Sequence, residues 1–345
     1  MILNDYTITY LVCAFISTLI GVIASCTGVR VWRQWDVSSA SEEQYRLEKK
    51  VYLIITILSL GFFLRLLNIP LWFLTLHSMI ISIPGAMCLV GVHNIAAPLS
   101  FLASGMKLIL PVFYGYWLTL NFLDRKVMAQ PFMKQKMLFL LPLGILVLVE
   151  TGLDTAFLLS VPPRQVSCCT SLFDLPVEST PLILSAAAAG HYWLSFFYGG
   201  VLLLLADIYL LMLGSDNRHA SAIKQWNMKR TTASIRTVFA FFTLAACIAA
   251  LHSTISALLL KLPFHHCVFC LGQHRWDVLV AFCLIFVGVS LYTICAWLKA
   301  AIDKWTACSD VTGPIDRMVK WAGILLITGT TILSITLMIS ITKGG

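Results

Sequence analysis

Charged residues are scarce in this 345-residue chain, and no segment is polar enough to form a soluble domain. Only 12% of the residues are charged and 59% are hydrophobic, whereas soluble globular chains carry roughly 25% charged residues. The mean hydropathy of +0.87 points the same way. This shortage of charge excludes an ordinary soluble protein and indicates an integral membrane protein.

The sequence lacks other features as well, and each absence argues against a particular kind of segment or partner. The first apolar run, TITYLVCAFISTLIGVIASCTGV, has no basic stretch before it and no small-residue cleavage site after it, so we expect a retained helix and not a signal peptide. We expect no internal repeat and no low-complexity tract. It also lacks a basic stripe with interleaved aromatic residues, so nucleic acid is not an expected partner.

Uninterrupted apolar runs of roughly 20 residues predict membrane-spanning helices, because hydrocarbon offers no water to satisfy backbone polar groups. We therefore expect an all-α, polytopic integral membrane helical bundle of about eight transmembrane helices, forming a single domain over residues 1–345. The predicted spans are 7–29, 51–69, 97–122, 137–160, 191–213, 237–260, 278–298 and 321–342. The short apolar segment 70–84 is predicted to be an interfacial or re-entrant helix.

Lysine and arginine concentrate in alternate loops, at 30–50, 125–136, 218–236 and 299–320. Short loops rich in these residues stay cytoplasmic, so both termini are expected to be extracytoplasmic. The formal net charge of +8 then mainly reports topology. We expect a multi-pass protein of the lipid bilayer, in the cytoplasmic membrane if the source is bacterial, with any protein partner docking on the outer loops.

Cysteine and histidine outside the predicted spans gather on the outer face. Buried cysteine within a span is an ordinary small hydrophobic residue, so the loop residues are the informative ones. The cysteines in the predicted outer loops are Cys88, Cys168, Cys169, Cys267 and Cys270. The histidines in the same loops are His93, His265, His266 and His274.

Cys267 and Cys270 form a C-x-x-C, a spacing that lets two sulfurs bind one metal ion or close a small disulfide. His265 and His266 directly precede the pair and add imidazole donors. Leu271 follows Cys270, so the C-x-x-C-H signature of covalent haem attachment is absent. The first hypothesis is a soft-metal site for copper, with zinc as the second choice, because thiolate and imidazole select such ions.

Other loop residues extend this candidate site. Cys168 and Cys169 are adjacent, and a disulfide between neighbours is strained, so the pair suits metal capture or thiol exchange. Cys88 and His93 are predicted accessory donors. The alternative is structural disulfides among these cysteines with unrelated surface histidines.

The second hypothesis is an enzyme, a membrane thiol-disulfide oxidoreductase coupled to a quinone. The pairs Cys168/Cys169 and Cys267/Cys270 resemble the arrangement of quinone-linked disulfide-forming membrane proteins, and the resemblance is confined to these pairs. It implies that a loop pair passes electrons to a C-x-x-C at the end of a helix. The metal hypothesis ranks first, because a disulfide relay has no use for the neighbouring histidines.

Ionisable residues inside the membrane are costly and are functional candidates by default. The predicted spans hold Lys107, Glu150, Asp154 and His252 in their outer half, where they are expected to form a polar column. Such a column would supply protons to a quinone or, as a third hypothesis, line a transport path. The alternative is a Lys107–Glu150 ion pair that only locks two helices together. Arg65 and Asp207 are expected near opposite interfaces, with their charged groups reaching toward water.

Overall fold

The protein is described by a computed structural model, which covers residues 4–35, 41–86, 88–127, 130–161, 190–213, 222–261, 267–302 and 312–342. Every regular element within these residues is a helix, and eight helices are long and apolar enough to cross a membrane. The predicted all-α architecture is therefore confirmed, and the described residues contain eight candidate membrane-spanning helices, as predicted. The extracytoplasmic location of the termini stays a prediction.

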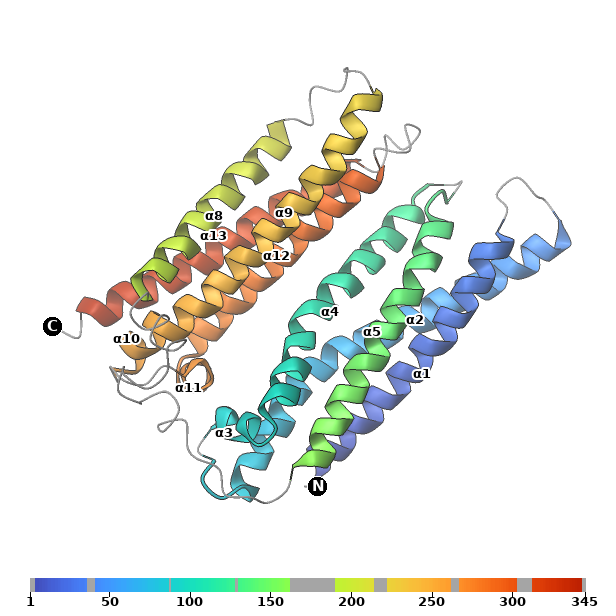
Figure 1. The fold of residues 1–345 in the computed structure, drawn as a ribbon. Coiled ribbons are helices and arrows are strands. Elements are labelled where there is room, and N and C mark those ends of the chain that lie inside the picture. Colours follow the sequence, from blue (N-terminus) through green and yellow to red (C-terminus); the bar gives the residue numbers. More distant parts are fainter. Residues whose placement is uncertain are drawn as a thin grey trace. The chain divides into compact units, whose positions relative to one another are not determined.

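The chain divides into two compact units, Met1–Val166 and Ser167–Gly345, and each unit contains four of the long helices (Figure 1). The units are described separately below. The prediction of a single transmembrane domain over residues 1–345 stays a prediction.

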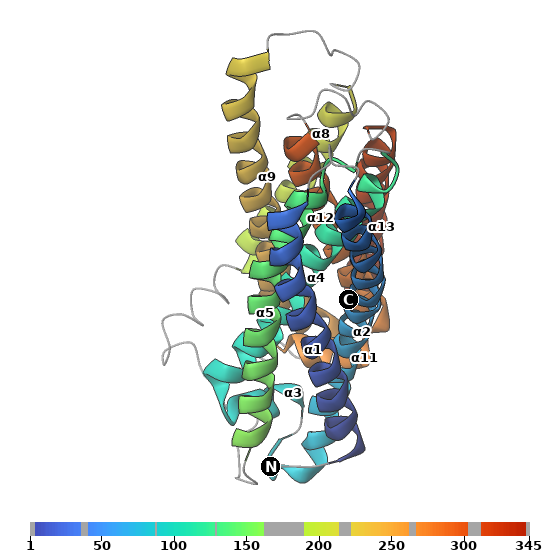
Figure 2. The ribbon, with the colours of Figure 1, turned by 90° about the vertical axis from the view of Figure 1, so that its right-hand side faces the viewer.

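The first unit is a ring of four long helices with short helical pieces between the second and third. Its elements are α1 (Asp5–Gln34), α2 (Glu42–Met79), η1 (Ile80–Ser82), α3 (Leu89–Asn94), α4 (Ala97–Asp124) and α5 (Met133–Ser160). Helix α1 packs against α2 and α5, and α4 packs against the same two helices. Helices α1 and α5 lie side by side in both views of the molecule (Figures 1 and 2).

Small residues bring α1 and α5 close together. A Cβ atom added to Gly144 of α5 would collide with the Ser25 hydroxyl of α1, and a Cβ added to Gly28 would lie 2.9 Å from the Met137 carbonyl oxygen. Ser25 donates a hydrogen bond to the Leu140 carbonyl at 2.8 Å. Membrane helices associate by such close packing and interhelical hydrogen bonds, since lipid provides no hydrophobic drive between them.

Helix α2 is longer than the sequence predicts at both ends. It begins after Ser41, whose hydroxyl accepts a hydrogen bond from the backbone N–H of Gln44 at 3.2 Å and caps the helix. It continues through Pro70 to Met79, so the segment 70–84 is not a separate interfacial or re-entrant helix. Proline breaks one helical hydrogen bond, but membrane helices tolerate it where neighbouring groups satisfy the freed backbone.

The second unit is also a ring of four long helices. Its elements are α8 (Gly190–Leu213), α9 (Ala222–Ala250), η3 (Leu251–Ile255), α10 (Ser256–Leu260), α11 (Val268–His274), α12 (Trp276–Ile302) and α13 (Thr312–Thr342). The π-helical turn η3 joins α9 and α10 into one candidate span, Thr232–Leu260. Helix α8 packs against α9 and α13, and α12 packs against the same two helices.

Two glycines of the second unit show that the backbones of α12 and α13 lie close together. A Cβ added to Gly329 of α13 would lie 2.9 Å from the Ala281 carbonyl oxygen and 2.9 Å from Ile285 Cγ1. A Cβ added to Gly288 of α12 would lie 3.2 Å from the Ala322 carbonyl oxygen. Glycine at these two positions therefore allows α12 and α13 to pack backbone to backbone.

We expect Gly329→Ala to destabilise the protein, because the new methyl group would press on backbone atoms of α12. Overpacking of this kind costs about 1–3 kcal/mol, and thermal unfolding of the purified protein in detergent would show a lower Tm. Gly199→Ala in α8 is the matched control, since a Cβ there has no neighbour within 4 Å. Equal Tm values for the two variants would contradict the packing described here.

Candidate functional site

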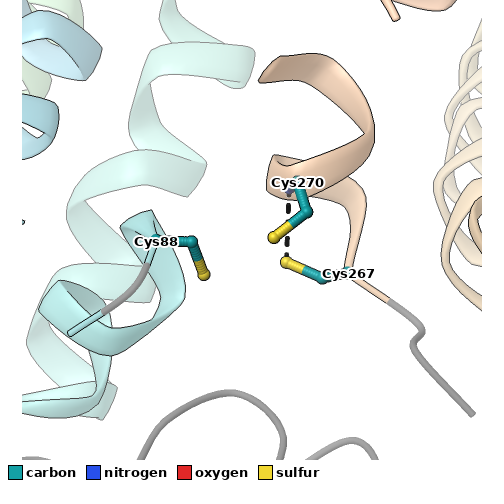
Figure 3. Close-up of side chains that lie close together, drawn as sticks. All are labelled: Cys88, Cys267 and Cys270. Atoms are coloured by element: carbon teal, nitrogen blue, oxygen red, sulfur yellow. Dashed lines mark hydrogen bonds between the residues drawn. The ribbon is translucent and has the colours of Figure 1, made fainter. Parts of the chain in front are cut away.

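The short helix α11 presents the two cysteines of the C-x-x-C within one turn. Cys267 precedes the helix in extended conformation, and its sulfur accepts a hydrogen bond from the Cys270 backbone N–H at 3.4 Å (Figure 3). The two sulfur atoms lie within 4.8 Å of each other. Both residues are thiols and no disulfide joins them. Cys267 is buried and Cys270 is half-buried, so the pair has one sheltered and one accessible member.

Charged groups fix the C-terminal end of α11. Arg275, which ends the helix, donates two hydrogen bonds to the Asp277 carboxylate, at 3.0 and 2.7 Å. The hydrogen bond to Asp277 raises the pKa of the Arg275 guanidinium, which therefore stays charged. Thr336 of α13 donates to Asp277 at 2.9 Å. This network ties α11 to the start of α12 and to α13, and so holds the thiol pair in place.

The remaining predicted ligands are found in different places. His265, His266, Cys168 and Cys169 lie outside the described residues. Cys88 immediately precedes α3 in the first unit, where it is buried. One further donor was not singled out as a ligand from the sequence: His274 follows Cys270 by four residues, so it lies on the same face of α11, and it is exposed.

His93 is a buried member of α3. Its ring stacks on Phe101, with centroids 5.1 Å apart, and its carbonyl accepts a hydrogen bond from the Ser100 hydroxyl at 2.7 Å. Burial lowers the pKa of His93 from 6.5 to about 4, since a charged imidazolium is poorly solvated there. The imidazole is therefore neutral near pH 7, which is the form that binds metals.

The predicted intramembrane residues of the first unit meet in one charge cluster. The Lys107 ammonium of α4 donates to the Asp154 carboxylate of α5 at 2.6 Å and also to the Glu150 carboxylate. All three side chains are at most 5% exposed. The structure thus brings Lys107, Glu150 and Asp154 together, and the ion pair between Lys107 and Glu150 is part of a larger group.

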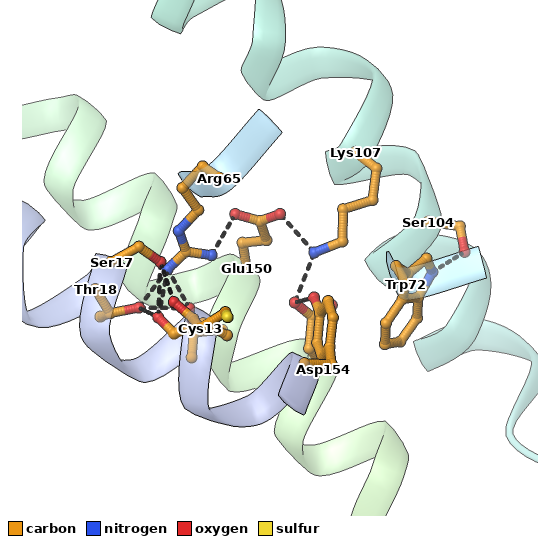
Figure 4. Close-up of polar contacts among 12 residues, drawn as sticks. Cys13, Ser17, Thr18, Arg65, Trp72, Ser104, Lys107, Glu150 and Asp154 are labelled. Atoms are coloured by element: carbon orange, nitrogen blue, oxygen red, sulfur yellow. Dashed lines mark hydrogen bonds and ion pairs between the residues drawn. The ribbon is translucent and has the colours of Figure 1, made fainter. Parts of the chain in front are cut away.

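Arg65 of α2 is the fourth charge of this cluster, and the prediction that it reaches toward an interface was wrong. Its guanidinium donates to Glu150 at 2.9 Å, to the Thr151 hydroxyl at 2.7 Å and to the Thr18 hydroxyl (Figure 4). The sequence misplaced Arg65 because Pro70 was taken as the end of the span. Since α2 continues to Met79, Arg65 lies well inside the helix.

Aromatic residues complete the surroundings of the charges. The Tyr10 hydroxyl of α1 donates to Asp154 Oδ2 at 2.5 Å, and the Tyr114 hydroxyl of α4 lies 3.5 Å from Glu150 Oε2. The Lys107 ammonium also lies 5.3 Å from the centroid of the Trp72 ring, within the range of a cation–π interaction. The arrangement defined by Arg65, Lys107, Glu150 and Asp154 is called the charge quartet below.

Two polar residues that the sequence singles out, His252 and Asp207, lie in the second unit. His252 lies in the π-helical turn η3, and its carbonyl accepts a hydrogen bond from the Ser256 hydroxyl at 2.7 Å. Asp207 accepts two hydrogen bonds from Arg236, at 2.9 and 3.0 Å, and one from Tyr292 at 2.6 Å. The Asp207 carboxylate is thus held in an ion pair between helices, with its side chain 29% exposed, and its location near an interface stays a prediction.

These observations define the class: a multi-pass helical membrane protein with a reduced cysteine pair on a short helix and a buried charge quartet. Comparisons with models of protein families, with curated proteins and with solved structures find no match. The function proposed below therefore rests on the residues and their geometry alone.

We expect acid to destabilise the fold partly through His93. The unfolded imidazole has an ordinary pKa near 6.5, and the folded one titrates at about 4. Stability from the neutral ring is therefore complete above about pH 6.5 and is lost as the pH falls from 6.5 toward 4.

His93→Phe keeps an aromatic ring against Phe101 and removes the titrating group. The fall in Tm between about pH 7 and about pH 5 should be smaller for this variant than for the original protein. The same pH dependence in both proteins would show that His93 does not contribute.

Proposed function

We propose that the thiols of Cys267 and Cys270 hold a soft metal ion, copper first and zinc second, at the extracytoplasmic face of this membrane protein. The supporting observation is the separation of their sulfur atoms, which is within 4.8 Å. Two metal–sulfur bonds of about 2.3 Å allow at most about 4.6 Å between sulfurs on one ion. The pair therefore needs little rearrangement to chelate.

The two sulfurs need further donors if the ion is zinc. Structural zinc takes four ligands in a tetrahedron, and imidazole nitrogen is the natural complement to thiolate. His265 and His266 are adjacent to Cys267 in the sequence, and His274 shares the face of α11 that carries Cys270. We propose these histidines as the first candidates, with Cys168, Cys169, Cys88 and His93 as the further donors that the sequence predicts.

The proposed activity is to receive, hold or hand over the ion. Cys270 is half-buried whereas Cys267 is buried, so an ion or a donor protein would reach Cys270 first. A protein partner that docks on the outer loops would exchange the ion by ligand replacement at this thiol. The network of Arg275, Asp277 and Thr336 would keep α11 in place during such an exchange.

The second candidate function uses the same sulfur atoms for thiol-disulfide exchange. Oxidation of Cys267 and Cys270 to a disulfide would release two electrons and two protons, which a membrane quinone would accept as it becomes quinol. No disulfide joins the pair, and the short separation of its sulfurs is compatible with this chemistry. Metal binding remains the first proposal because it also accounts for the clustered histidines.

Metal analysis of the full-length protein, purified in detergent without chelator, tests the first proposal. Copper or zinc is expected at about one ion per chain, and Cys267→Ser or Cys270→Ser should lower this ratio at least tenfold. Cys283→Ser is the control, because Cys283 is an exposed thiol of α12 in the same unit. Equal metal content in all variants, or no metal in any of them, would contradict the proposal.

Thiol counting on the same samples separates the two candidates. Metal ligands should be thiols before any reductant is added, once the ion has been removed by acid or a chelator. Two thiols that appear only after reduction, and that are lost in both Cys267→Ser and Cys270→Ser, would instead support the oxidoreductase. A quinone-reduction assay would then be the deciding measurement.

A further inference from the structure

The two units follow one structural plan. In each, two long helices are followed by a short helix and then by two more long helices. The spacing is nearly constant: Cys267 comes 179 residues after Cys88, α12 begins 179 residues after α4, and α13 begins 179 residues after α5. Helix α8 likewise ends 179 residues after α1. The long helices of the two units therefore follow the same order at nearly the same spacing.

Residues at the same spacing also agree. Pro84 and Cys88 correspond to Pro263 and Cys267, and the run Gly144-Ile145-Leu146 corresponds to Gly323-Ile324-Leu325. The two glycines face the corresponding helix of their unit: a Cβ on Gly144 would collide with Ser25 of α1, and a Cβ on Gly323 would contact Ile208 of α8.

An ion pair also joins the third and fourth long helices of each unit near their connecting loop. Asp124 pairs with Lys136 at 2.7 Å in the first unit, and Lys299 pairs with Asp316 at 2.9 Å in the second. The shared spacing, the matching residues and the common order of long helices indicate two copies of a four-helix repeat, which the sequence analysis did not reveal.

The second copy of the repeat shows which residues stand at the positions that correspond to the charge quartet. At the same spacing, Arg65, Lys107, Glu150 and Asp154 correspond to Leu244, Phe286, Gly329 and Leu333. Leu244, Gly329 and Leu333 are buried, as their charged counterparts are. The second unit thus builds the same four-helix ring with apolar residues at all four positions, and it closes α12 onto α13 at Gly329.

The comparison indicates that the four-helix fold does not need the charges. Moving a charge out of water is expensive, and replacing a buried ion pair by apolar residues of similar volume is often neutral or stabilising. Ionisable groups inside a membrane are accordingly rare and mark functional sites. The quartet of the first unit is therefore maintained for a purpose other than packing.

We propose that the charge quartet is an intramembrane proton-binding site, with Asp154 as the group that takes up the proton. Its Oδ2 atom already accepts hydrogen bonds from Tyr10 and Lys107. Its Oδ1 atom is buried and has no hydrogen-bond partner among the described residues. Oδ1 is the atom at which a proton would bind.

Proton uptake changes the charge balance by one. With two cations and two carboxylates, the quartet is neutral before binding. Binding of one proton converts the Asp154 carboxylate to the acid, leaves the Lys107 ammonium paired with Glu150, and gives the quartet a net charge of +1. The groups that face Asp154 and its partners are Tyr10 from α1, Arg65 from α2, Lys107 and Tyr114 from α4, and Glu150 from α5.

The proposed proton-binding site does not depend on the thiol pair. It adds proton binding to the metal binding proposed above. Loss of the proposed metal at Cys267 and Cys270 would leave the quartet intact, because none of its hydrogen bonds or ion pairs involves either cysteine. The ligand of this site is a proton, as expected for a proton-coupled membrane protein.

Infrared difference spectroscopy of the full-length protein in lipid, recorded as the pH is lowered, tests the proposal directly. The expected result is a carboxylic acid C=O band that is lost in Asp154→Asn and retained in Asp207→Asn. Asp207 is the matched control, because it is an ion-paired carboxylate of the second unit. A band that persists in Asp154→Asn, or no band in the original protein, would overturn the assignment.

A second variant tests whether the charges are structural. Arg65→Leu, Lys107→Met, Glu150→Leu and Asp154→Leu together remove all four charges and keep apolar side chains of similar volume. This variant should insert, keep a Tm at or above that of the original protein and lack the infrared band, whereas Lys107→Met alone should unfold at lower temperature, since it leaves two carboxylates buried together. Failure of the fourfold variant to fold would show that the quartet is a packing device and would also overturn the proposal.

Discussion

Water is missing from the interior of a bilayer, and this one constraint explains most of the structure. A polar group in hydrocarbon has to find its partner within the protein, and the described helices satisfy most of their backbone groups internally. Side chains meet the same requirement. The Lys107 ammonium lies between two carboxylates, and the Arg65 guanidinium reaches Glu150 and two threonine hydroxyls. Each charge is thus held by partners from neighbouring helices.

Helix packing follows from the same constraint, because lipid tails do not drive apolar helices together. Close approach is achieved by small residues, at Ser25 and Gly144 between α1 and α5 and at Gly288 and Gly329 between α12 and α13. The two units differ in helix packing at one pair of corresponding positions, Glu150 and Gly329. Where the second unit closes its last two helices on Gly329, the first unit places Glu150 and fills the space with ion pairs.

The sequence was sufficient for features that depend on composition along the chain. The eight helices follow from apolar runs that match the thickness of hydrocarbon, and the spacing of Cys267 and Cys270 places both thiols on one turn of α11. Features that depend on the packing of helices against one another could not be predicted from the sequence. Arg65 was misplaced because a proline can either end a membrane helix or continue within it, and only neighbouring helices decide which. The repeat was missed because apolar residues substitute freely in a helix core, so equivalent positions share burial but rarely identity.

Four long helices are described in each unit, and this even number has a consequence for biosynthesis. A segment that crosses the membrane four times returns the chain to the face from which it started, so a second copy can follow the first without any change of orientation. Basic loops recur accordingly, at 30–50 and 125–136 in the first unit and at 218–236 and 299–320 in the second. If these loops are cytoplasmic, as the sequence predicts, each copy carries its own orientation signal for the insertion machinery. The first four helices can then be integrated while the ribosome is still translating the second unit.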